Sequence, residues 1–271
     1  VYIGGNTFPH PPLVGVPLLV STAFFGISNI SLKLTYFLLF LFFVFFIFLK
    51  FNTFLNKYLS LLLTISLFTI PGVLYLGSTI EQALWTTICF SIILLEIIKK
   101  EEINYKKLFI IIMIFSFLRI LSLLSVAAII FFVLFKTKSI KTFANELKKI
   151  IKNSYPLFFV IPFISFSFLE YSILTHDRVG FDEINLTKFL SDIPIIILDN
   201  FTIPAGILFF VLLLISLFYR SSWLLISFSL VLMTVYINVF KDTLTNLSVS
   251  PKYLYEIFFP YFIVACFIFL S

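Results

Sequence analysis

Long apolar stretches with almost no charge constrain this chain more than any other feature of its sequence. The stretch from Ser31 to Leu49 carries one charged residue, Lys33, and comparable stretches recur as far as the last residues. A helix needs about 20 apolar residues to cross a bilayer, and backbone in lipid has to satisfy its own hydrogen bonds, as a helix does. Hydrophobic residues make up 61% of the sequence and charged residues 12%, which is far from the composition of soluble domains. The sequence therefore predicts an all-α, polytopic helical membrane protein.

The apolar segments indicate about six full spans, a short broken helix pair and an interfacial helix. The segments from which the spans are drawn lie at about 31–49, 58–76, 83–98, 155–174, 203–218, 223–240 and 253–270. In the second of these segments Pro71 and Gly72 are expected to let the chain bend near its outer end. Gly77 is expected to permit the tight turn that leads into the third segment.

The broken helix pair is predicted from the apolar block between Leu108 and Phe135. This block lies between two lysine-rich segments and is too short for two ordinary spans. If both lysine-rich segments are cytoplasmic, two short helices broken near Arg119 would enter the membrane and return, because a charge at membrane depth is tolerated only against protein or water. One long tilted span with a snorkelling Arg119 is the alternative. The segment from Lys136 to Lys152, which holds six lysines, is interpreted as a cytoplasmic loop.

A rigid, proline-rich segment precedes the first long apolar stretch. In Phe8-Pro9-His10-Pro11-Pro12-Leu13 the three prolines fix φ and remove backbone donors, so these residues cannot form the interior of a helix. The segment is interpreted as a loop lying on a membrane. The apolar residues from Leu13 to Phe25 are too few to span and predict an interfacial helix that ends at Gly26. A proline-rich connector with an incidental histidine is the alternative.

The distribution of charge predicts the orientation of the chain. Most lysines fall in the proposed cytoplasmic segments and most acidic residues lie toward the other face, as the positive-inside rule requires. The four N-x-S/T triplets also fall on the non-cytoplasmic side, at Asn29, Asn185, Asn200 and Asn246. We therefore expect an integral, multi-pass protein of the plasma membrane or endoplasmic reticulum, with loops 1–30 and 175–202 non-cytoplasmic.

A single transmembrane domain, 1–271, is expected. It divides into an outer loop with the interfacial helix at 1–30, an N-terminal helical half at 31–152 and a C-terminal helical half at 153–271. Because the chain starts at Val1 without a methionine and stops at Ser271 beside an apolar run, we expect a fragment truncated at both ends.

Several short motifs, taken in order, resemble those of one enzyme family. Pro9-His10-Pro11-Pro12-Leu13, then Gly26 and the helix start Ser31-Leu32-Lys33-Leu34, resemble the first-luminal-loop region of the GT-C glycosyltransferases, in the branch of the protein mannosyltransferases and aminoarabinose transferases. Three further matches follow: a proline-containing span that ends in a polar turn with an acid (Pro71 to Glu81), a short helix pair with a basic residue (Arg119), and a late helix (Lys252, Tyr253, Pro260). This order covers nearly the whole chain.

The resemblance implies an enzyme that takes a sugar from a polyprenyl-phosphate carrier and passes it to a lipid, protein or glycan acceptor on the non-cytoplasmic face. A lipid-phosphate donor needs basic groups near the interface, for which His10, Lys33 and Arg119 are the candidates, and an acid facing water, for which Glu81 and Asp177 are. Glu81 matches an acid that orients or deprotonates the acceptor. The family's main catalytic aspartate precedes the PPL segment, whereas no acid precedes His10 here. Either this catalytic aspartate lies in a missing N-terminal segment, or the chain is not catalytic.

The candidate residues also have ordinary structural interpretations. Lys33 suits an anchor at a helix end, Glu81 suits the N-terminus of the third span, where the helix dipole favours an acid, and Asp177 lies in a charged loop of the kind that water solvates. The metal ligands stay unknown. His10, His176 and a carboxylate leave a divalent metal open, and no cofactor is certain.

Two other classes of function stay open. A non-catalytic GT-C-like subunit that recognises a glycolipid would share the proline-rich loop and lack the acids. A polytopic transporter or flippase would show inverted repeats and midplane charges, but no repeat is evident and the charges lie mostly near the ends of the spans. Nucleic-acid binding is excluded despite a net charge of +6, because the lysines are confined to short segments that flank apolar stretches.

Overall fold

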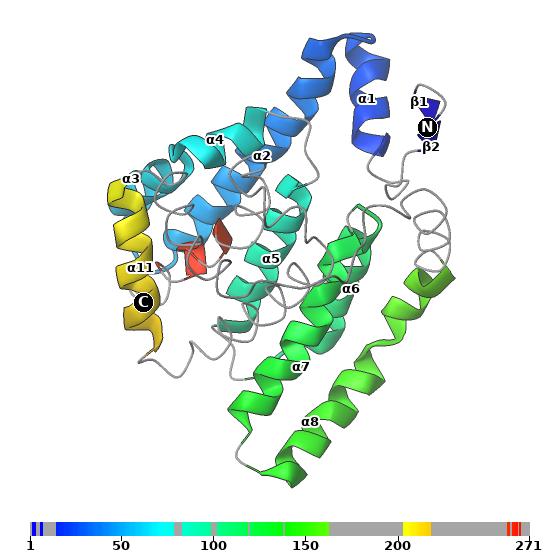
Figure 1. Ribbon diagram of the computed structural model, residues 1–271, viewed down its shortest axis with the longest axis vertical. Helices are drawn as coiled ribbons and strands as arrows, with labels where there is room; N and C mark the ends of the chain where they lie inside the picture. Colours follow the sequence, from blue (N-terminus) through cyan, green and yellow to red (C-terminus); the bar gives the residue numbers. More distant parts are fainter. Residues whose placement is uncertain are drawn as a thin grey trace, which may run out of the picture.

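The computed structural model describes residues 2–3, 6–7, 15–78, 83–98, 102–118, 120–137, 139–162, 203–217, 259–260, 262–264 and 266. Apart from a hairpin of two-residue strands, the regular structure in these ranges is helical, so the all-α prediction is confirmed for them (Figure 1). The elements are β1 (Tyr2–Ile3), β2 (Asn6–Thr7), α1 (Gly15–Phe25), α2 (Asn29–Phe51), α3 (Lys57–Phe68), α4 (Pro71–Ser78), α5 (Ala83–Ile98), α6 (Tyr105–Ser116), η2 (Ile120–Leu123), α7 (Leu124–Lys136), α8 (Ile140–Asn153), η3 (Tyr155–Val160) and α11 (Ile203–Leu217).

The helices α1 and α2 form a hairpin whose turn is specified locally. Gly26 follows the last residue of α1 with φ of 74°, a left-handed conformation that glycine adopts without strain. Ser28 then caps α2 in a reciprocal capping box with Ser31. The Ser21 hydroxyl of α1 donates to the Ser31 carbonyl at 2.6 Å and ties the two helices together. The helix predicted after the proline-rich segment therefore exists as α1, whereas residues 8–14 lie outside the described ranges.

Although the sequence of α2 is apolar all round, the helix has one buried and one exposed face. The buried residues recur every three or four positions, at Tyr36, Phe40, Phe43, Ile47 and Phe51. The exposed face is equally apolar and includes Phe37, Leu38, Leu41, Phe42 and Phe45. By length and composition α2 could cross a membrane, yet only 22% of its most apolar stretch is buried in the structure. Among the described residues it is the one unbroken helix that meets this test.

The second predicted span, 58–76, is not one straight helix. The chain bends by 84° between α3 and α4, at Thr69 and Ile70. Pro71 explains the break, because its ring has no N–H to donate and disfavours helical geometry in the preceding residue. At the first position of a helix the same ring is well accommodated, so α4 begins there. The expected bend is thus present, but much sharper than a span with a bent outer end would need.

Gly77 has a packing role instead of the turn role that its position suggested. It lies inside α4, where a Cβ atom would come 2.6 Å from Cγ of Phe40. The absence of a side chain therefore allows α4 to cross the aromatic face of α2 at close range. The prediction that Gly77 permits a turn is wrong, since the helix continues through it to Ser78.

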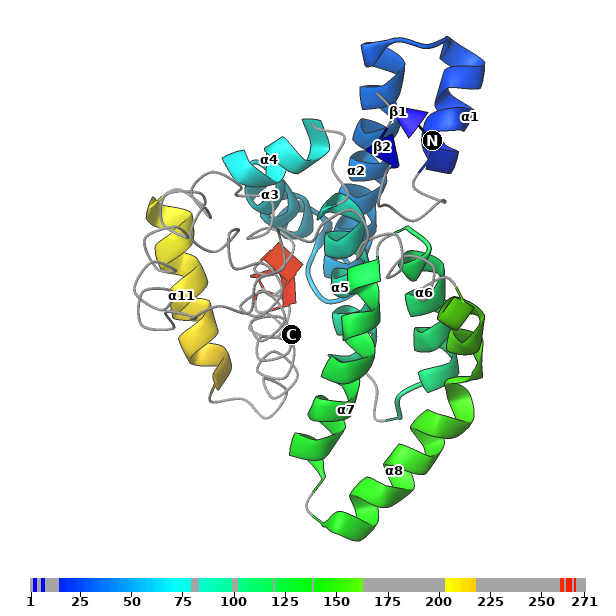
Figure 2. The ribbon, with the colours of Figure 1, turned by 45° about the vertical axis from the view of Figure 1, so that its right-hand side comes forward.

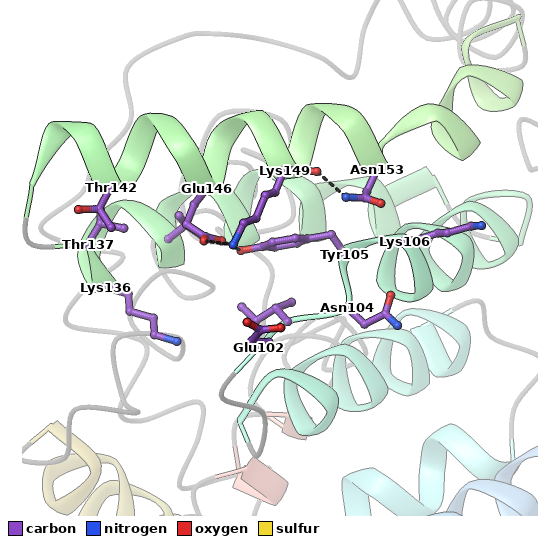
Figure 3. Close-up of a pocket in the computed structure, with 12 residues that line it drawn as sticks. Glu102, Asn104, Tyr105, Lys106, Lys136, Thr137, Thr142, Glu146, Lys149 and Asn153 are labelled. Carbon is purple, nitrogen blue, oxygen red and sulfur yellow. Dashed lines mark hydrogen bonds and ion pairs between the residues drawn. The ribbon is translucent and has the colours of Figure 1, made fainter.

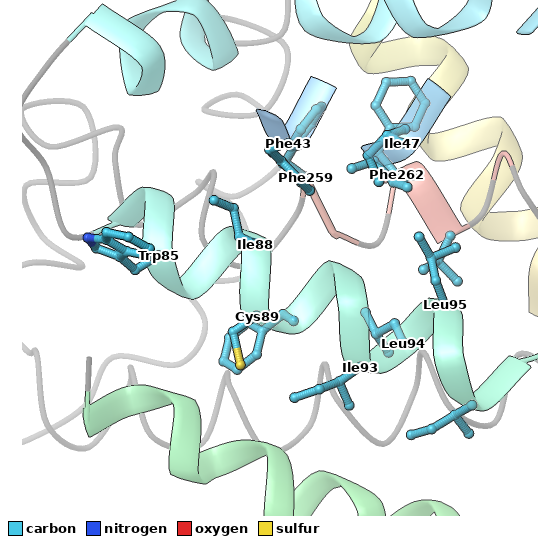
Figure 4. Close-up of a cluster of buried hydrophobic side chains, with 14 of the residues drawn as sticks. Phe43, Ile47, Trp85, Ile88, Cys89, Ile93, Leu94, Leu95, Phe259 and Phe262 are labelled. Atoms are coloured by element: carbon cyan, nitrogen blue, oxygen red, sulfur yellow. The ribbon is translucent and has the colours of Figure 1, made fainter. Parts of the chain in front are cut away.

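The third predicted span, 83–98, is confirmed as a helix and forms the centre of the described structure. α5 lies between α2 and the group of α6 and α7 in both views (Figure 1, Figure 2), and its side chains are buried almost throughout. Figure 4 shows Phe43 and Ile47 of α2 on the same side of α5 as Phe259 and Phe262, while Cys89 points to the other side. A helix that is apolar on every face needs such a position.

The break predicted within 108–135 is present, and one long tilted span is excluded. α6 ends at Ser116, the turn of η2 covers Ile120 to Leu123, and α7 begins at Leu124. Arg119 itself lies outside the described residues. α6 packs against α5 and beside α7, and η2 contacts both α5 and α7 (Figure 1, Figure 2).

The lysine-rich segment 136–152 is mostly helical, which corrects its interpretation as a loop. Ser139 caps α8 by accepting a hydrogen bond from the backbone N–H of Thr142 at 3.2 Å. Phe143, Leu147 and Ile150 recur at helical spacing and turn inward, with Ile150 only 3% exposed. The lysines lie on its exposed surface, together with Ile140 and Ile151, so α8 is amphipathic.

The predicted spans in the C-terminal half lie mainly outside the described residues. Of 155–174, only the start is described, as η3 and the two residues after it. α11 matches the segment 203–218, and 223–240 lies outside the described ranges, as do most residues of 253–270.

Candidate functional site

A cavity of about 710 Å³, lined mostly by polar residues, lies where α6, α7 and α8 meet. α8 contributes one face of its helix, at positions four, three and four residues apart: Thr142, Glu146, Lys149 and Asn153. The segment that leads into α6 and the end of α7 complete the lining, with Glu102, Ile103, Asn104, Tyr105, Lys106, Val133, Lys136 and Thr137. Figure 3 shows the α8 stripe along one side and Tyr105 reaching toward it.

Glu146 is held from both sides at the wall of this cavity. The Tyr105 hydroxyl donates to Glu146 Oε2 at 3.1 Å, and Lys149 Nζ donates to Glu146 Oε1 at 2.8 Å (Figure 3). Tyr105 is buried, whereas the Lys149 side chain is exposed. The phenol is therefore fixed by packing and orients the carboxylate, which in turn holds the ammonium group at the cavity.

These contacts shift the pKa of all three groups away from neutrality. The pKa of Glu146 is lowered, chiefly by the hydrogen bond from Lys149; burial opposes this shift, and the hydrogen bond from Tyr105 adds a smaller lowering effect. Burial, followed by the negative charge of Glu146, raises the pKa of Tyr105, and the hydrogen bond to Glu146 raises the pKa of Lys149. None of the three exchanges a proton near pH 7, so this arrangement suits binding better than acid–base catalysis.

Positive charge exceeds negative charge around the cavity. Three lysines and two glutamates line it, and α8 adds exposed lysines outside the lining at Lys141, Lys148 and Lys152. Lys136 lies with its ammonium group 5.7 Å from the ring centre of Phe132, and within the described residues it forms no ion pair. At the start of α6, Asn104 accepts from the backbone N–H of Lys107 and caps the helix. The cavity therefore favours an anion.

A second group of polar side chains is buried in the helical core, near the helix break. The Ser122 and Ser125 hydroxyls lie next to the Cys89 thiol of α5, which is only a weak hydrogen-bonding group. Apart from this thiol, neither hydroxyl has a hydrogen-bond partner within the described residues, and the Thr86 hydroxyl and the indole N–H of Trp85 have none there. An unpartnered buried polar group costs about 1–3 kcal/mol, so these atoms mark a place where a polar partner would be stabilising.

Among the site residues predicted from the sequence, Lys33 alone lies in the described part of the chain. It occupies the second turn of α2 and is exposed, as an anchor at a helix end would be. The other predicted site residues, His10, Glu81, Arg119 and Asp177, lie outside the described residues. Because only one of the five is described, the structure does not test whether they lie together, and their shared site stays a prediction.

A metal site is likewise untested at its predicted ligands. In the ranges that the structure describes, no three His, Cys, Asp or Glu side chains gather as metal ligands. His10 and His176 both lie outside these ranges.

Sequence reasoning missed the cavity between α6, α7 and α8. Its residues come from three helices and from positions 102 to 153, so no local motif joins them. One signal was present: Ser139 followed by an apolar residue every three or four positions is typical of a capped amphipathic helix. In that helix Thr142, Glu146 and Lys149 share a face.

Comparison of the chain with protein-family models, with characterised proteins and with solved structures gave no match in any of the three.

Proposed function

We propose that this protein is embedded in a membrane by several helices. The support is α2, whose exposed face carries large apolar side chains, such as Phe42 at 69% exposure. Apolar surface of this extent is unfavourable in water and favourable in lipid. α1, α5 and α7 are also apolar helices, although shorter ones. The remaining spans belong to the predicted segments of the C-terminal half.

Within this membrane domain we propose a glycosyltransferase of the GT-C type. It would move a sugar from a polyprenyl-phosphate carrier to a lipid, protein or glycan acceptor on the non-cytoplasmic face. The observation that carries the proposal is the interrupted helix between Ser116 and Leu124, beside the buried Ser122 and Ser125 hydroxyls, whose neighbour is the weakly hydrogen-bonding Cys89 thiol. Irregular backbone at membrane depth is tolerated where it is covered by protein or lines a polar cavity. A basic residue at position 119, in this break, is then suited to the phosphate of a lipid carrier.

The proposed roles follow the chemistry of each group. Arg119 would bind the carrier phosphate through its planar set of donors, with His10 and Lys33 adding positive charge. Glu81 would orient or deprotonate the acceptor, and Asp177 would contact substrate from the outer loop. Lys33 is consistent with a role near the interface, because it is exposed in the second turn of α2.

The proposal is tested with Glu81→Gln in the full-length protein, supplied with a polyprenyl-phosphate-linked sugar. Glutamine keeps the size of the side chain and most of its hydrogen bonds, so loss of a base or orienting group predicts a fall in turnover of about a hundredfold with the fold intact. Glu183→Gln makes the same change of charge in the outer loop and is expected to retain activity.

A companion variant separates phosphate binding from folding. Arg119→Ala is expected to weaken use of the donor much more than it lowers the folded yield, and Arg119→Lys is expected to restore part of the loss.

Wild-type turnover in Glu81→Gln would remove Glu81 from the site. Donor binding without turnover in the wild-type full-length protein would favour a non-catalytic subunit instead.

A further inference from the structure

We propose that the cavity between α6, α7 and α8 binds the phosphate headgroup of an anionic phospholipid. The cavity lies on the side of the chain that the lysine distribution predicts to be cytoplasmic, opposite the proposed sugar-transfer site. The bound lipid would anchor the protein to one leaflet. This binding site is separate from the site of the proposed sugar transfer.

Charge is the first observation that carries this proposal. Lys106, Lys136 and Lys149 line the cavity, and α8 carries further exposed lysines outside its lining. Lys149 is already positioned by Glu146, which Tyr105 holds from the other side (Figure 3). An incoming phosphate therefore meets one ammonium group, that of Lys149, which is already oriented. Basic pockets between membrane helices on the cytoplasmic side are suited to anionic headgroups.

Apolar exposure on the same elements distinguishes a lipid from a soluble phosphate. Ile140 and Ile151 of α8 are 89% and 63% exposed, although α8 is otherwise polar on its outer surface. η3 follows α8 directly and exposes Phe158 and Phe159. A helix with lysines and exposed apolar side chains is typical of one that lies in the membrane interface. Acyl chains would meet these side chains while the headgroup occupies the cavity.

The size of the cavity agrees with such a ligand. At about 710 Å³ it falls in the range of sites that hold small molecules, and its lining offers hydroxyl and amide groups besides the lysines, at Thr137, Thr142 and Asn153. These groups suit phosphate and glycerol oxygens.

The experiment titrates the detergent-purified full-length protein with phosphatidylglycerol and counts bound lipids by native mass spectrometry. The cavity variant Lys136→Gln/Lys149→Gln is compared with Lys141→Gln/Lys152→Gln, which removes the same charge from the same region outside the cavity. We expect the cavity variant to lose affinity by about twenty-fivefold, since each interfacial lysine contributes roughly a fivefold effect, and the outer variant to change by less than about threefold. Equal losses in both variants, or no loss in either, would overturn the cavity as the binding site.

Two further arms keep the result interpretable. Lys136→Arg preserves the charge and is expected to bind the lipid as the wild type does. The unfolding temperature of Lys136→Gln/Lys149→Gln is measured as well. If it is unchanged, the cavity variant lost a contact and not its fold. Inorganic phosphate and phosphatidylcholine are titrated in parallel, and both are expected to bind at least about tenfold more weakly than phosphatidylglycerol. Phosphate binding as tight as that of the lipid would contradict a lipid ligand.

Discussion

At the scale of single residues, Glu146 organises the polar cavity because it accepts from a buried phenol and an exposed ammonium group at once. The Tyr105 hydroxyl is fixed by packing, so it defines where the carboxylate lies. Lys149 is exposed, and its ion pair with Glu146 lies at the surface, where such pairs are worth little for stability. The bond from Tyr105 is therefore the contact to Glu146 with the larger expected effect on folding.

We predict that Tyr105→Phe lowers the stability of the protein by about 1 kcal/mol at pH 7, because a hydrogen bond to an ionised group is lost. The pKa of Glu146 is lowered in the folded protein. The stability contributed by its charged form is thus present above the unfolded value of about 4.3 and is lost as pH falls through the lower, folded value. The difference between variant and wild type should shrink toward about pH 3. Thermal unfolding in detergent at both pH values measures it.

The matched control is Tyr155→Phe, which removes the hydroxyl of an exposed tyrosine on η3. This variant is expected to differ little from wild type at either pH. If the deficit of Tyr105→Phe stayed constant or grew on acidification, the Glu146 carboxylate would not be its cause.

At the scale of elements, hydropathy predicts the apolar helices α2 and α5 but does not predict the lysine-rich helix α8. α2 and α5 could be predicted from the sequence with bounds close to those observed, because a long apolar run determines both their length and their helical state. The six lysines in 136–152 predict a loop, although the apolar residues of α8 recur at helical spacing. The sharp bend before Pro71 was foreseen in position but not in angle, since the angle depends on how α4 packs against α2.

The candidate site could be predicted only in part, for a related reason. Charge and motif order picked out single residues such as Glu81 and Arg119, which stay predictions. The cavity depends on three helices that meet in space. No spacing along the sequence predicts that the Tyr105 hydroxyl lies 3.1 Å from Glu146 Oε2. Long-range contacts of this kind follow from packing, which hydropathy does not encode.

The packing of α8 is tested by two neighbouring isoleucines. Ile150 is 3% exposed and Ile151 is 63% exposed. We predict that Ile150→Ala lowers the free energy of unfolding by about 2–4 kcal/mol, through lost burial and the cavity left behind. Ile151→Ala should change it by less than about 0.5 kcal/mol. Unfolding of the two variants in the same detergent measures the difference. Two equally small effects would mean that the segment behaves as a loop.

At the scale of the whole molecule, we propose two polar sites on opposite faces of a helical membrane domain. α5 is enclosed by other helices, while α2 turns large apolar side chains outward. This arrangement suits lipid surroundings, in which an apolar exterior costs nothing. The proposed transfer site would face the non-cytoplasmic side and the headgroup cavity the cytoplasmic side.

The proposed membrane topology is tested most directly by measuring on which side of the membrane two segments of the chain lie. A reporter fused after Lys152, at the end of α8, and another near Asp192, in the predicted outer loop, are compared in the full-length protein. The account predicts a cytoplasmic signal from the first and a luminal or exterior signal from the second, because the lysines gather on one side. Signals from the same side, or the reverse pattern, would contradict the membrane topology on which both proposed sites depend.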